Sequence, residues 1–307
     1  MITSFFNTSK PIHFVIVLIL ALCTFVFFRL YISDVDLDAL YIGKQLGLFL
    51  ILSWSIGVLA FLTSKNNLLQ NNSYNVLLFS VFLAIIPATI QNDYILISNF
   101  FVLLALRRII SLRSKISVKK KLFDAAFWIA IASLFHFWSI LFFVLIIVAL
   151  IFYVIEDLKN WIIPFIGFFV VALLFSCYHI LTESTFGSIE KYWSGISLDF
   201  TAYNSLKIII GITVLLSFGL WSSFFYFKKV GEQTRSIKAS FVLVYIAFLL
   251  GVTLVVITPQ KDGSEFLFVF APLAIIISNY IETINEKWFA EVFVWLIVIT
   301  PVVTLLL

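Results

Sequence analysis

Lysine and arginine residues are concentrated in alternate gaps between long apolar runs, and this pattern constrains the fold of the chain most strongly. Hydrophobic residues make up 63% of the 307 positions, charged residues only 12%, and the mean hydropathy is +1.13. A single globular core cannot bury so much apolar surface, so a soluble fold is excluded. Segment after segment reaches the roughly 20 apolar residues that a helix needs to cross a bilayer. The sequence therefore predicts an all-α, polytopic transmembrane helical bundle.

The polar gaps between the apolar segments predict the individual spans. We expect clear spans at approximately 12–32, 45–62, 75–91, 94–110, 161–180, 206–227, 240–258, 266–281 and 289–307. The sequence contains no internal repeat, no low-complexity tract and no long tail, and the gaps between spans are short. Residues 1–307 are therefore predicted to form a single transmembrane helical domain with short loops.

Residues 125–155 are apolar almost without interruption and need a separate decision. As one helix this run would be about 46 Å long, at ~1.5 Å per residue, against a hydrocarbon core of about 30 Å. Either the helix is strongly tilted, or the chain reverses inside the run. The reversal would lie at His136-Phe137-Trp138-Ser139, where a polar ring and an interfacial aromatic side chain interrupt the run.

The positive-inside rule favours the reversal, because the rule requires an excess of Lys and Arg in short cytoplasmic loops. With the reversal and a cytoplasmic N-terminus, 15 of the 20 basic residues lie on the cytoplasmic side. The remaining five face out: Arg29, Lys44, Lys191, Lys207 and Lys261. Without the reversal the split falls to 12 against 8. We therefore predict about eleven spans, with about ten as the alternative, and a cytoplasmic N-terminus.

Several functional classes are disfavoured by the sequence. The basic run from Arg107 to Lys121 is better explained as a determinant of topology than as a nucleic-acid patch, so no nucleic-acid partner is expected. Cys23 and Cys177 lie inside predicted spans, where they are expected to pack as small apolar residues. The chain has no CxxC, HExxH or GxSxG motif and no glycine-rich phosphate loop, so a nucleotide-driven cytosolic machine is not expected.

The predicted topology places a group of carboxylates in the first outer loop. Asp34, Asp36 and Asp38 alternate along the chain, so in an extended loop their side chains point to one side. Such a group can hold a divalent cation, Mg or Mn, with Asp36 and Asp38 as the expected ligands. Alternatively, one member with a raised pKa can serve as a general base. The competing interpretation is a solvated acidic loop without a site.

Three further outer residues are candidate substrate-binding groups. Asp93 lies in a tight turn between two short spans, where it is either a turn former or a site carboxylate. His136 lies at the outer reversal, where it either binds a backbone carbonyl or serves the site. Lys261 is one of the few outward cations and could pair with a phosphate. Arg29 and Lys44 could do the same, or extend toward lipid head groups.

The order of these features resembles the GT-C superfamily of membrane glycosyltransferases, which use polyprenyl-phosphate sugars. In that superfamily an acidic residue follows the first span, often with an aromatic residue after it, as Asp34, Asp36, Asp38 and then Tyr41 do here. The resemblance implies that Tyr41 binds substrate. Short paired spans that reverse at the outer surface around a polar residue are also similar to the stretch around His136.

A late aromatic span with a proline is the third point of similarity. Glu265-Phe266-Leu267-Phe268-Val269-Phe270-Ala271-Pro272 has the outline of the superfamily's late motif, with Glu265 in the place of an arginine. The overall composition also looks like an uncharacterised inner-membrane family of Bacteroidota, which implies a bacterial inner-membrane location and no particular activity.

The resemblance implies sugar transfer from a polyprenyl-phosphate donor on the outer leaflet. A carboxylate among Asp34, Asp36 and Asp38 would then deprotonate the acceptor or bind a metal, and Lys261 or His136 would stabilise the leaving phosphate. The alternative is a non-catalytic membrane subunit or scaffold of a cell-envelope assembly. Transport is a third alternative, which the absence of carboxylates in the middle of the spans disfavours.

Overall fold

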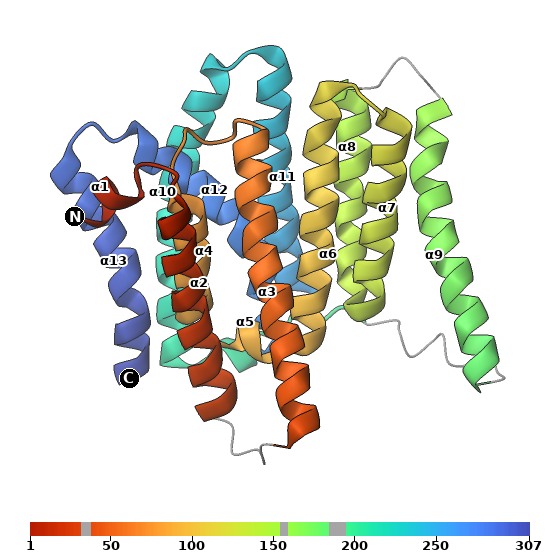
Figure 1. Ribbon diagram of the computed structural model, residues 1–307, viewed down its shortest axis with the longest axis horizontal. Helices are drawn as coiled ribbons and strands as arrows, with labels where there is room; N and C mark the ends of the chain where they lie inside the picture. Colours follow the sequence, from red (N-terminus) through yellow and green to blue (C-terminus); the bar gives the residue numbers. More distant parts are fainter. Residues whose placement is uncertain (32–37, 154–158, 184–194) are drawn as a thin grey trace.

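The computed structural model describes residues 1–31, 38–153, 159–183 and 195–307, and all regular elements within these ranges are helices (Figure 1). The elements, in chain order, are α1 (Ile2–Phe6), α2 (Pro11–Val26), the π-helical turn η1 (Phe27–Tyr31), α3 (Ala39–Lys65), α4 (Tyr74–Ile85), α5 (Ala88–Gln91), α6 (Asp93–Ile110), the 3₁₀ turn η2 (Ser111–Ser114), α7 (Val118–Phe135), the 3₁₀ segment η3 (Phe137–Phe142), α8 (Phe143–Tyr153), α9 (Lys159–Glu183), the 3₁₀ turn η5 (Thr201–Tyr203), α10 (Leu206–Glu232), α11 (Arg235–Ile257), the 3₁₀ turn η6 (Ser264–Phe266), α12 (Leu267–Thr283) and α13 (Lys287–Leu306).

Many of these helices are built to cross a membrane. Within the described residues, eight helical segments are long and apolar enough to do so: Pro11–Arg29, Ala39–Lys65, Asp93–Ser114, Lys159–Thr182, Leu206–Glu232, Arg235–Ile257, Ser264–Thr283 and Lys287–Leu306. Two shorter apolar segments are Tyr74–Ile85 and Phe137–Tyr153. The prediction of an all-α integral membrane bundle is therefore confirmed.

The long apolar run at 125–155 is broken by a reversal of the chain. Helix α7 ends at Phe135, His136 is extended (φ −141°, ψ 106°), and α8 returns beside α7 (Figure 1). The turn is pinned to α6 by Ser98, whose hydroxyl donates to the carbonyl of Ala132 at 2.9 Å and pairs with the Ser139 hydroxyl at 2.7 Å. Because Ser98 and Ser139 are fully buried, this contact fixes where the reversal occurs.

Helix α12 forms the centre of the bundle. In its segment 89% of the residues are buried, far more than in any other candidate span of the described chain. Close approach to α11 depends on Gly251, where a Cβ atom would lie only 3.0 Å from the Phe268 carbonyl oxygen. Small residues allow such close backbone contact between membrane helices. Helix α12 is therefore positioned by packing on all sides, and the residues at its start are positioned with it.

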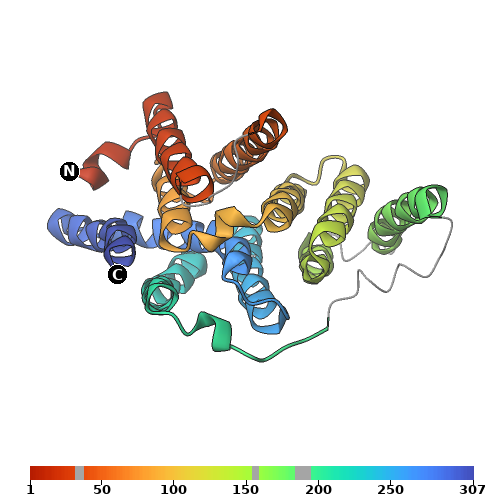
Figure 2. The ribbon, with the colours of Figure 1, turned by 90° about the horizontal axis from the view of Figure 1, so that it is seen from below.

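Helix α9 lies at one edge of the bundle and α13 at the other (Figures 1 and 2). Only 17% of the α9 segment is buried. Its contact with α7 is nevertheless close, because a Cβ atom on Gly167 would lie 2.8 Å from the Phe123 carbonyl oxygen. Most of the α9 surface is therefore free to contact lipid.

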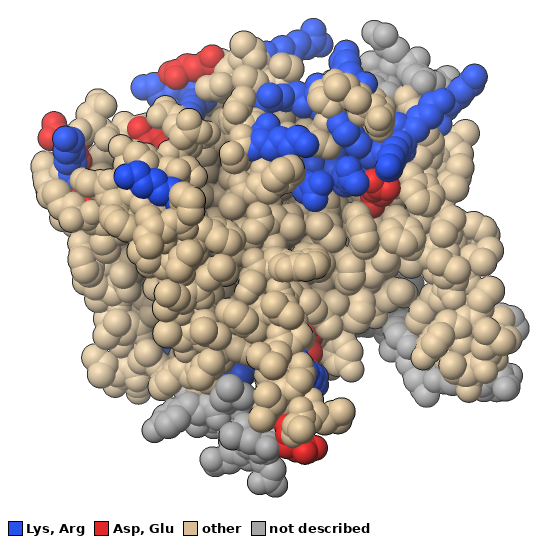
Figure 3. Space-filling view, viewed as in Figure 1, with Lys and Arg blue, Asp and Glu red and all other residues tan. Residues whose placement is uncertain are grey.

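The two ends of the bundle differ in charge. We call the end with the α6–α7, α10–α11 and α12–α13 connections the basic end, because Lys and Arg side chains gather there (Figure 3). The opposite end, which we call the His136 end, carries the α7–η3 and α11–α12 connections (Figure 1). The uneven distribution of Lys and Arg along the sequence therefore corresponds to two ends of the molecule that differ in charge.

Candidate functional site

Of the three aspartates predicted as a site in the first outer loop, one lies within the described residues. Asp34 and Asp36 lie outside the described residues. Asp38 is described and exposed, and it caps α3 by accepting a hydrogen bond from the Ala39 backbone N–H at 2.7 Å. An aspartate in this position stabilises the start of a helix. Within the described residues no group of three or more His, Cys, Asp or Glu side chains is arranged to hold a metal ion.

Asp93 is the centre of an ion-pair network. Its carboxylate pairs with Arg29 and, at 2.6 Å, with Lys44. The Arg29 side chain is only 5% exposed, and its guanidinium also donates to Gln45 Oε1 at 2.7 Å and to the Gln91 carbonyl at 2.9 Å. Buried arginine needs such partners because an unpaired buried charge is costly. The network ties η1, α3 and the start of α6 together.

Tyr41, predicted as a substrate-binding residue, adds to this network. Its hydroxyl donates to the Arg29 carbonyl at 3.2 Å, which connects α3 to η1. Arg29 and Tyr41 are therefore both engaged in contacts between helices. In this structure they hold η1 against α3.

The Lys261 ammonium is directed at backbone carbonyls. It donates to the carbonyls of Ser197 at 2.9 Å, Val256 at 2.7 Å and Thr258 at 2.7 Å. The ammonium also lies 4.8 Å from the centroid of the Phe200 ring. The carbonyls at the end of a helix lack partners within the helix, so a lysine there satisfies them and matches the helix dipole.

Burial lowers the pKa of Lys261, although the nearby carboxylates of Glu265 and Asp199 oppose this effect. The Lys261 side chain is almost fully buried. Its ammonium thus holds the end of α11 and the segment at Ser197 together, and it does not line the neighbouring pocket.

A pocket of about 450 Å³ opens at the His136 end. It is formed by the start of α6, the end of α7 and the α11–α12 connection. Its lining residues are Asn92, Tyr94, Ile95, Ser133, Leu134, Phe135, His136, Phe137, Thr258, Pro259, Gln260, Asp262 and Ser264. The three segments that the sequence singled out at 92–93, 136 and 258–265 therefore converge on one cavity. The lining contains no Lys or Arg.

His136 supplies an unpaired group to this pocket. Its Nε2 atom is buried and has no hydrogen-bond partner among the residues that the structure describes, and its ring stacks on Phe268 of α12 with centroids 5.5 Å apart. Burial lowers the pKa of His136 to about 4, and the neighbouring Asp262 carboxylate only partly opposes this shift. The imidazole is therefore neutral near pH 7, with one ring nitrogen free to accept or donate a hydrogen bond.

Asp262 is the ordered carboxylate of the pocket. Its Oδ1 accepts a hydrogen bond from the Ser264 backbone N–H at 2.9 Å and another from the Ser264 hydroxyl. Its Oδ2 lies 3.4 Å from Asn92 Nδ2, which links it to the start of α6. Burial alone would raise the pKa of Asp262, but these hydrogen bonds outweigh burial and hold the pKa below its usual value. Asp262 is therefore an anion beside a neutral histidine.

A second, fully buried carboxyl lies behind the pocket. Glu265 is 0% exposed, its Oε1 accepts a hydrogen bond from the Tyr203 hydroxyl, and its Oε2 has no donor within the described part of the chain. Asp262 interacts with this carboxyl from the pocket side. Sequence reasoning noted Glu265 as an outer acidic residue and as a departure from a motif, but gave it no role in the site, and it missed Tyr203. The available signal was an acidic residue at the start of an apolar span.

Comparisons with known proteins give a family and no named relative. The profile of a family of unknown function (DUF6427) matches residues 5–306. No curated protein and no solved structure matches the chain.

Proposed function

The chain belongs to the DUF6427 family, and we propose that it is a GT-C-like glycosyltransferase that moves a sugar from a polyprenyl-phosphate donor to an acceptor at the outer leaflet. The observation that carries the proposal is the buried Nε2 atom of His136, which no described residue pairs with, beside the Asp262 carboxylate in an open pocket. An unpaired polar atom in such a place is expected to meet a ligand.

The proposed orientation follows from the charge of the two ends. The basic end faces the cytoplasm, as the positive-inside rule requires, and the His136 end faces outward from a bacterial inner membrane. The bundle then crosses the bilayer about eleven times, with α7 and the shorter segments α4 and η3–α8 counted as spans beside the eight long ones. In this orientation the N-terminus is cytoplasmic and the pocket opens to the outer surface.

The pocket has the properties of a site for a hydroxylated acceptor. A volume of about 450 Å³ lies within the range of small-molecule sites, roughly 300–1,000 Å³. Tyr94, Phe135 and Phe137 offer apolar faces to a sugar ring, and Asn92, Asp262 and Ser264 offer hydrogen-bonding groups. A lining without Lys or Arg suits a neutral hydroxyl better than a phosphate.

The proposed chemistry assigns the proton transfer to His136. Neutral Nε2 takes the proton of the acceptor hydroxyl, the acceptor oxygen bonds to the anomeric carbon, and the bond from that carbon to the phosphate oxygen breaks. The leaving group is the polyprenyl phosphate. Asp262 stabilises the imidazolium that forms, because it is an anion close to the ring. Lys44, with a side chain that is 60% exposed, is the proposed contact for the leaving phosphate.

The first outer loop keeps its proposed role as a metal site. Asp34, Asp36 and Asp38 supply oxygen ligands of the kind that Mg or Mn prefers, with Asp36 and Asp38 as the proposed pair. A cation held there would neutralise the donor phosphate next to Lys44. This role and the role of His136 are separable, because each depends on different side chains.

The direct test is sugar transfer in proteoliposomes that contain the purified chain and a radiolabelled polyprenyl-phosphate sugar. Replacing His136 with alanine is expected to reduce transfer about 10²–10⁴-fold, the usual effect of removing a general base. His179→Ala is the matched control, because His179 lies on the peripheral helix α9. Unchanged transfer in His136→Ala and in all three Asp→Ala variants of the first loop would refute the catalytic proposal.

A non-catalytic subunit of an envelope assembly is the second candidate, and one observation favours it. Arg29, Asp93 and Lys261 are all engaged in contacts within the chain, as expected of groups that stabilise a scaffold. Native mass spectrometry of the solubilised chain tests this candidate. A stable stoichiometric protein partner, together with the absence of any transfer activity, would support the scaffold over the enzyme.

A further inference from the structure

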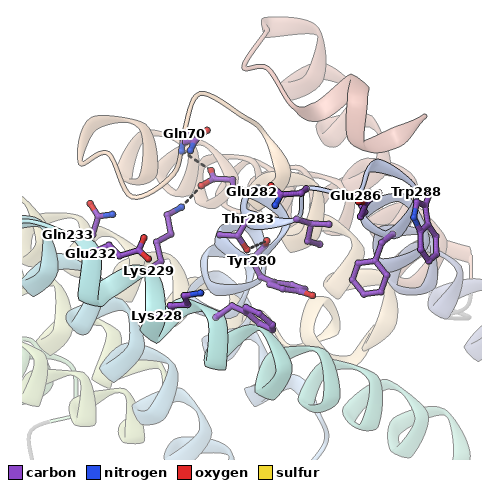
Figure 4. A pocket seen from close by; sticks show the side chains of 14 residues that line it. Gln70, Lys228, Lys229, Glu232, Gln233, Tyr280, Glu282, Thr283, Glu286 and Trp288 are labelled. Carbon is purple, nitrogen blue, oxygen red and sulfur yellow. Dashed lines mark hydrogen bonds and ion pairs between the residues drawn. The ribbon is translucent and has the colours of Figure 1, made fainter.

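A second pocket, of about 890 Å³, lies at the basic end between α10 and the α12–α13 connection (Figure 4). One ion pair is already complete within it. Lys229 Nζ lies 2.5 Å from Glu282 Oε2 and donates to Asn279 Oδ1 at 2.7 Å. Glu282 Oε1 accepts from the Gln70 backbone N–H at 2.7 Å. Lys229 and Glu282 therefore stabilise the wall, and their charges cancel.

The charges that remain for a ligand are Lys228, Glu232 and Glu286. All three side chains are exposed, and none forms a hydrogen bond or ion pair with any residue that the structure describes. One cationic group and two anionic groups around one cavity match a head group that itself carries both signs. A purely anionic ligand would meet two carboxylates against one ammonium, which is unfavourable.

An apolar groove between α10 and α13 adjoins the polar pocket. The groove is lined by Ser217, Phe218, Trp221, Phe289, Val292, Phe293 and Leu296. Phe289 lines both cavities, so they adjoin at this residue. Phe218 and Phe293 touch with ring centroids 4.6 Å apart and form the floor. Trp221, Val292 and Leu296 are about half exposed on the surface that faces the bilayer.

Trp288 lines the polar pocket and directly precedes Phe289, the residue that lines both cavities. Its side chain is 64% exposed, and it precedes Phe289 at the start of α13. Tryptophan is enriched at the level of lipid head groups. The polar pocket is thus at head-group depth, and the groove below it is at the depth of acyl chains.

We propose that this face is a specific site for a glycerophospholipid whose head group carries a phosphate and a primary amine. The phosphate pairs with the Lys228 ammonium, the lipid ammonium pairs with Glu232 or Glu286, and one acyl chain lies in the groove along Val292 and Leu296. The site lies at the opposite end of the bundle from the pocket of His136, so it does not depend on the function proposed for that pocket.

Native mass spectrometry of the full chain in detergent tests the site. The probes are phosphatidylethanolamine, phosphatidylcholine and phosphatidylglycerol with identical acyl chains. Retention of phosphatidylethanolamine is expected to exceed that of phosphatidylcholine about tenfold, because choline has no N–H group to donate to the carboxylates. Equal retention of these two lipids, or stronger retention of phosphatidylglycerol, overturns the proposal.

Two variants and two matched controls test whether the lipid binds at the proposed site. Lys228→Ala removes the phosphate contact, and Val292→Trp fills the groove; each is expected to lower phosphatidylethanolamine retention about tenfold. Lys238→Ala removes an exposed lysine at the same end, and Leu220→Trp enlarges an exposed residue of α10 outside the groove. Both controls are expected to retain the lipid like the wild type. If the two controls lose the lipid as much as the two variants do, the loss comes from a general change in charge or bulk, and the proposal fails.

Discussion

The buried charges at the His136 end and the exposed lysines at the basic end behave in opposite ways. At the His136 end, Arg29, Lys261 and Glu265 are buried and engaged by partners inside the chain. At the basic end, Lys119 and Lys238 are exposed to solvent. A buried charge must be paired, so it fixes the segments that pair with it. An exposed charge costs little, so it can report the side of the membrane without shaping a site.

Removal of the buried arginine should have the largest effect on stability. Arg29→Ala leaves Asp93 with only one of its two cationic partners and leaves Gln45 without its donor. We expect a loss of about 3 kcal/mol in the free energy of unfolding, near the lower end for breaking a buried pair. Unfolding in detergent, followed by tryptophan fluorescence, measures it.

The matched control is an ion pair at the basic end. Arg108 and Asp124 pair at 2.9 Å with side chains that are 33% and 21% exposed. Arg108→Ala is expected to cost less than about 1 kcal/mol. Equal losses in the two variants would contradict the distinction between the ends.

The free energy of unfolding should depend on pH through His136 in the pocket rather than through residues of the basic end. The folded chain holds the pKa of His136 at about 4, below its ordinary value of 6.5. Between these values the unfolded chain binds more protons, so stability is fully present above pH 6.5 and is lost as pH falls toward 4.

The expected contribution of this histidine is about 1–3 kcal/mol. The measurement is the difference in unfolding free energy between wild type and His136→Gln at pH 7 and pH 4.5. The difference should shift in favour of His136→Gln at the lower pH. A difference that does not change with pH would show that His136 is not held neutral.

Lys261 offers a further test of the same comparison. Lys261→Met keeps the length of the side chain but removes the donors to the carbonyls of Ser197, Val256 and Thr258. We expect a loss of about 1.5–3 kcal/mol, because hydrogen bonds from a charged donor are lost. Lys238→Met at the basic end is the control and should change the unfolding free energy by less than about 0.5 kcal/mol.

Sequence reasoning identified the segments that form the site, but not the contacts that their side chains make. The composition and the basic residues identify the helices and the two ends, because burial in a bilayer imposes apolar length and sidedness. The break at His136 was also expected, since a polar ring and tryptophan interrupt a run too long for one helix. These features are local, and the chain itself displays them.

The partners of the charged side chains could not be predicted in the same way. The Lys261 ammonium could reach solvent, a ligand or a carbonyl, and the choice depends on where Ser197 lies. The contact of Tyr203 with Glu265 joins residues 62 positions apart. Such pairings depend on the packing of helices around α12, which no spacing in the sequence encodes. Asp34 and Asp36 lie outside the described residues, so their roles stay predictions.

The reversal at His136 is the basis of the account, because it places the pocket at the end opposite the basic residues. Cysteine labelling of intact cells tests it directly, in a background where Cys23 and Cys177 are replaced by serine. A membrane-impermeant maleimide should label Asp199→Cys from outside and Lys119→Cys only after permeabilisation, because α7, α8 and α9 separate the two positions. Labelling of both positions from the same side would contradict the reversal and, with it, the proposed site.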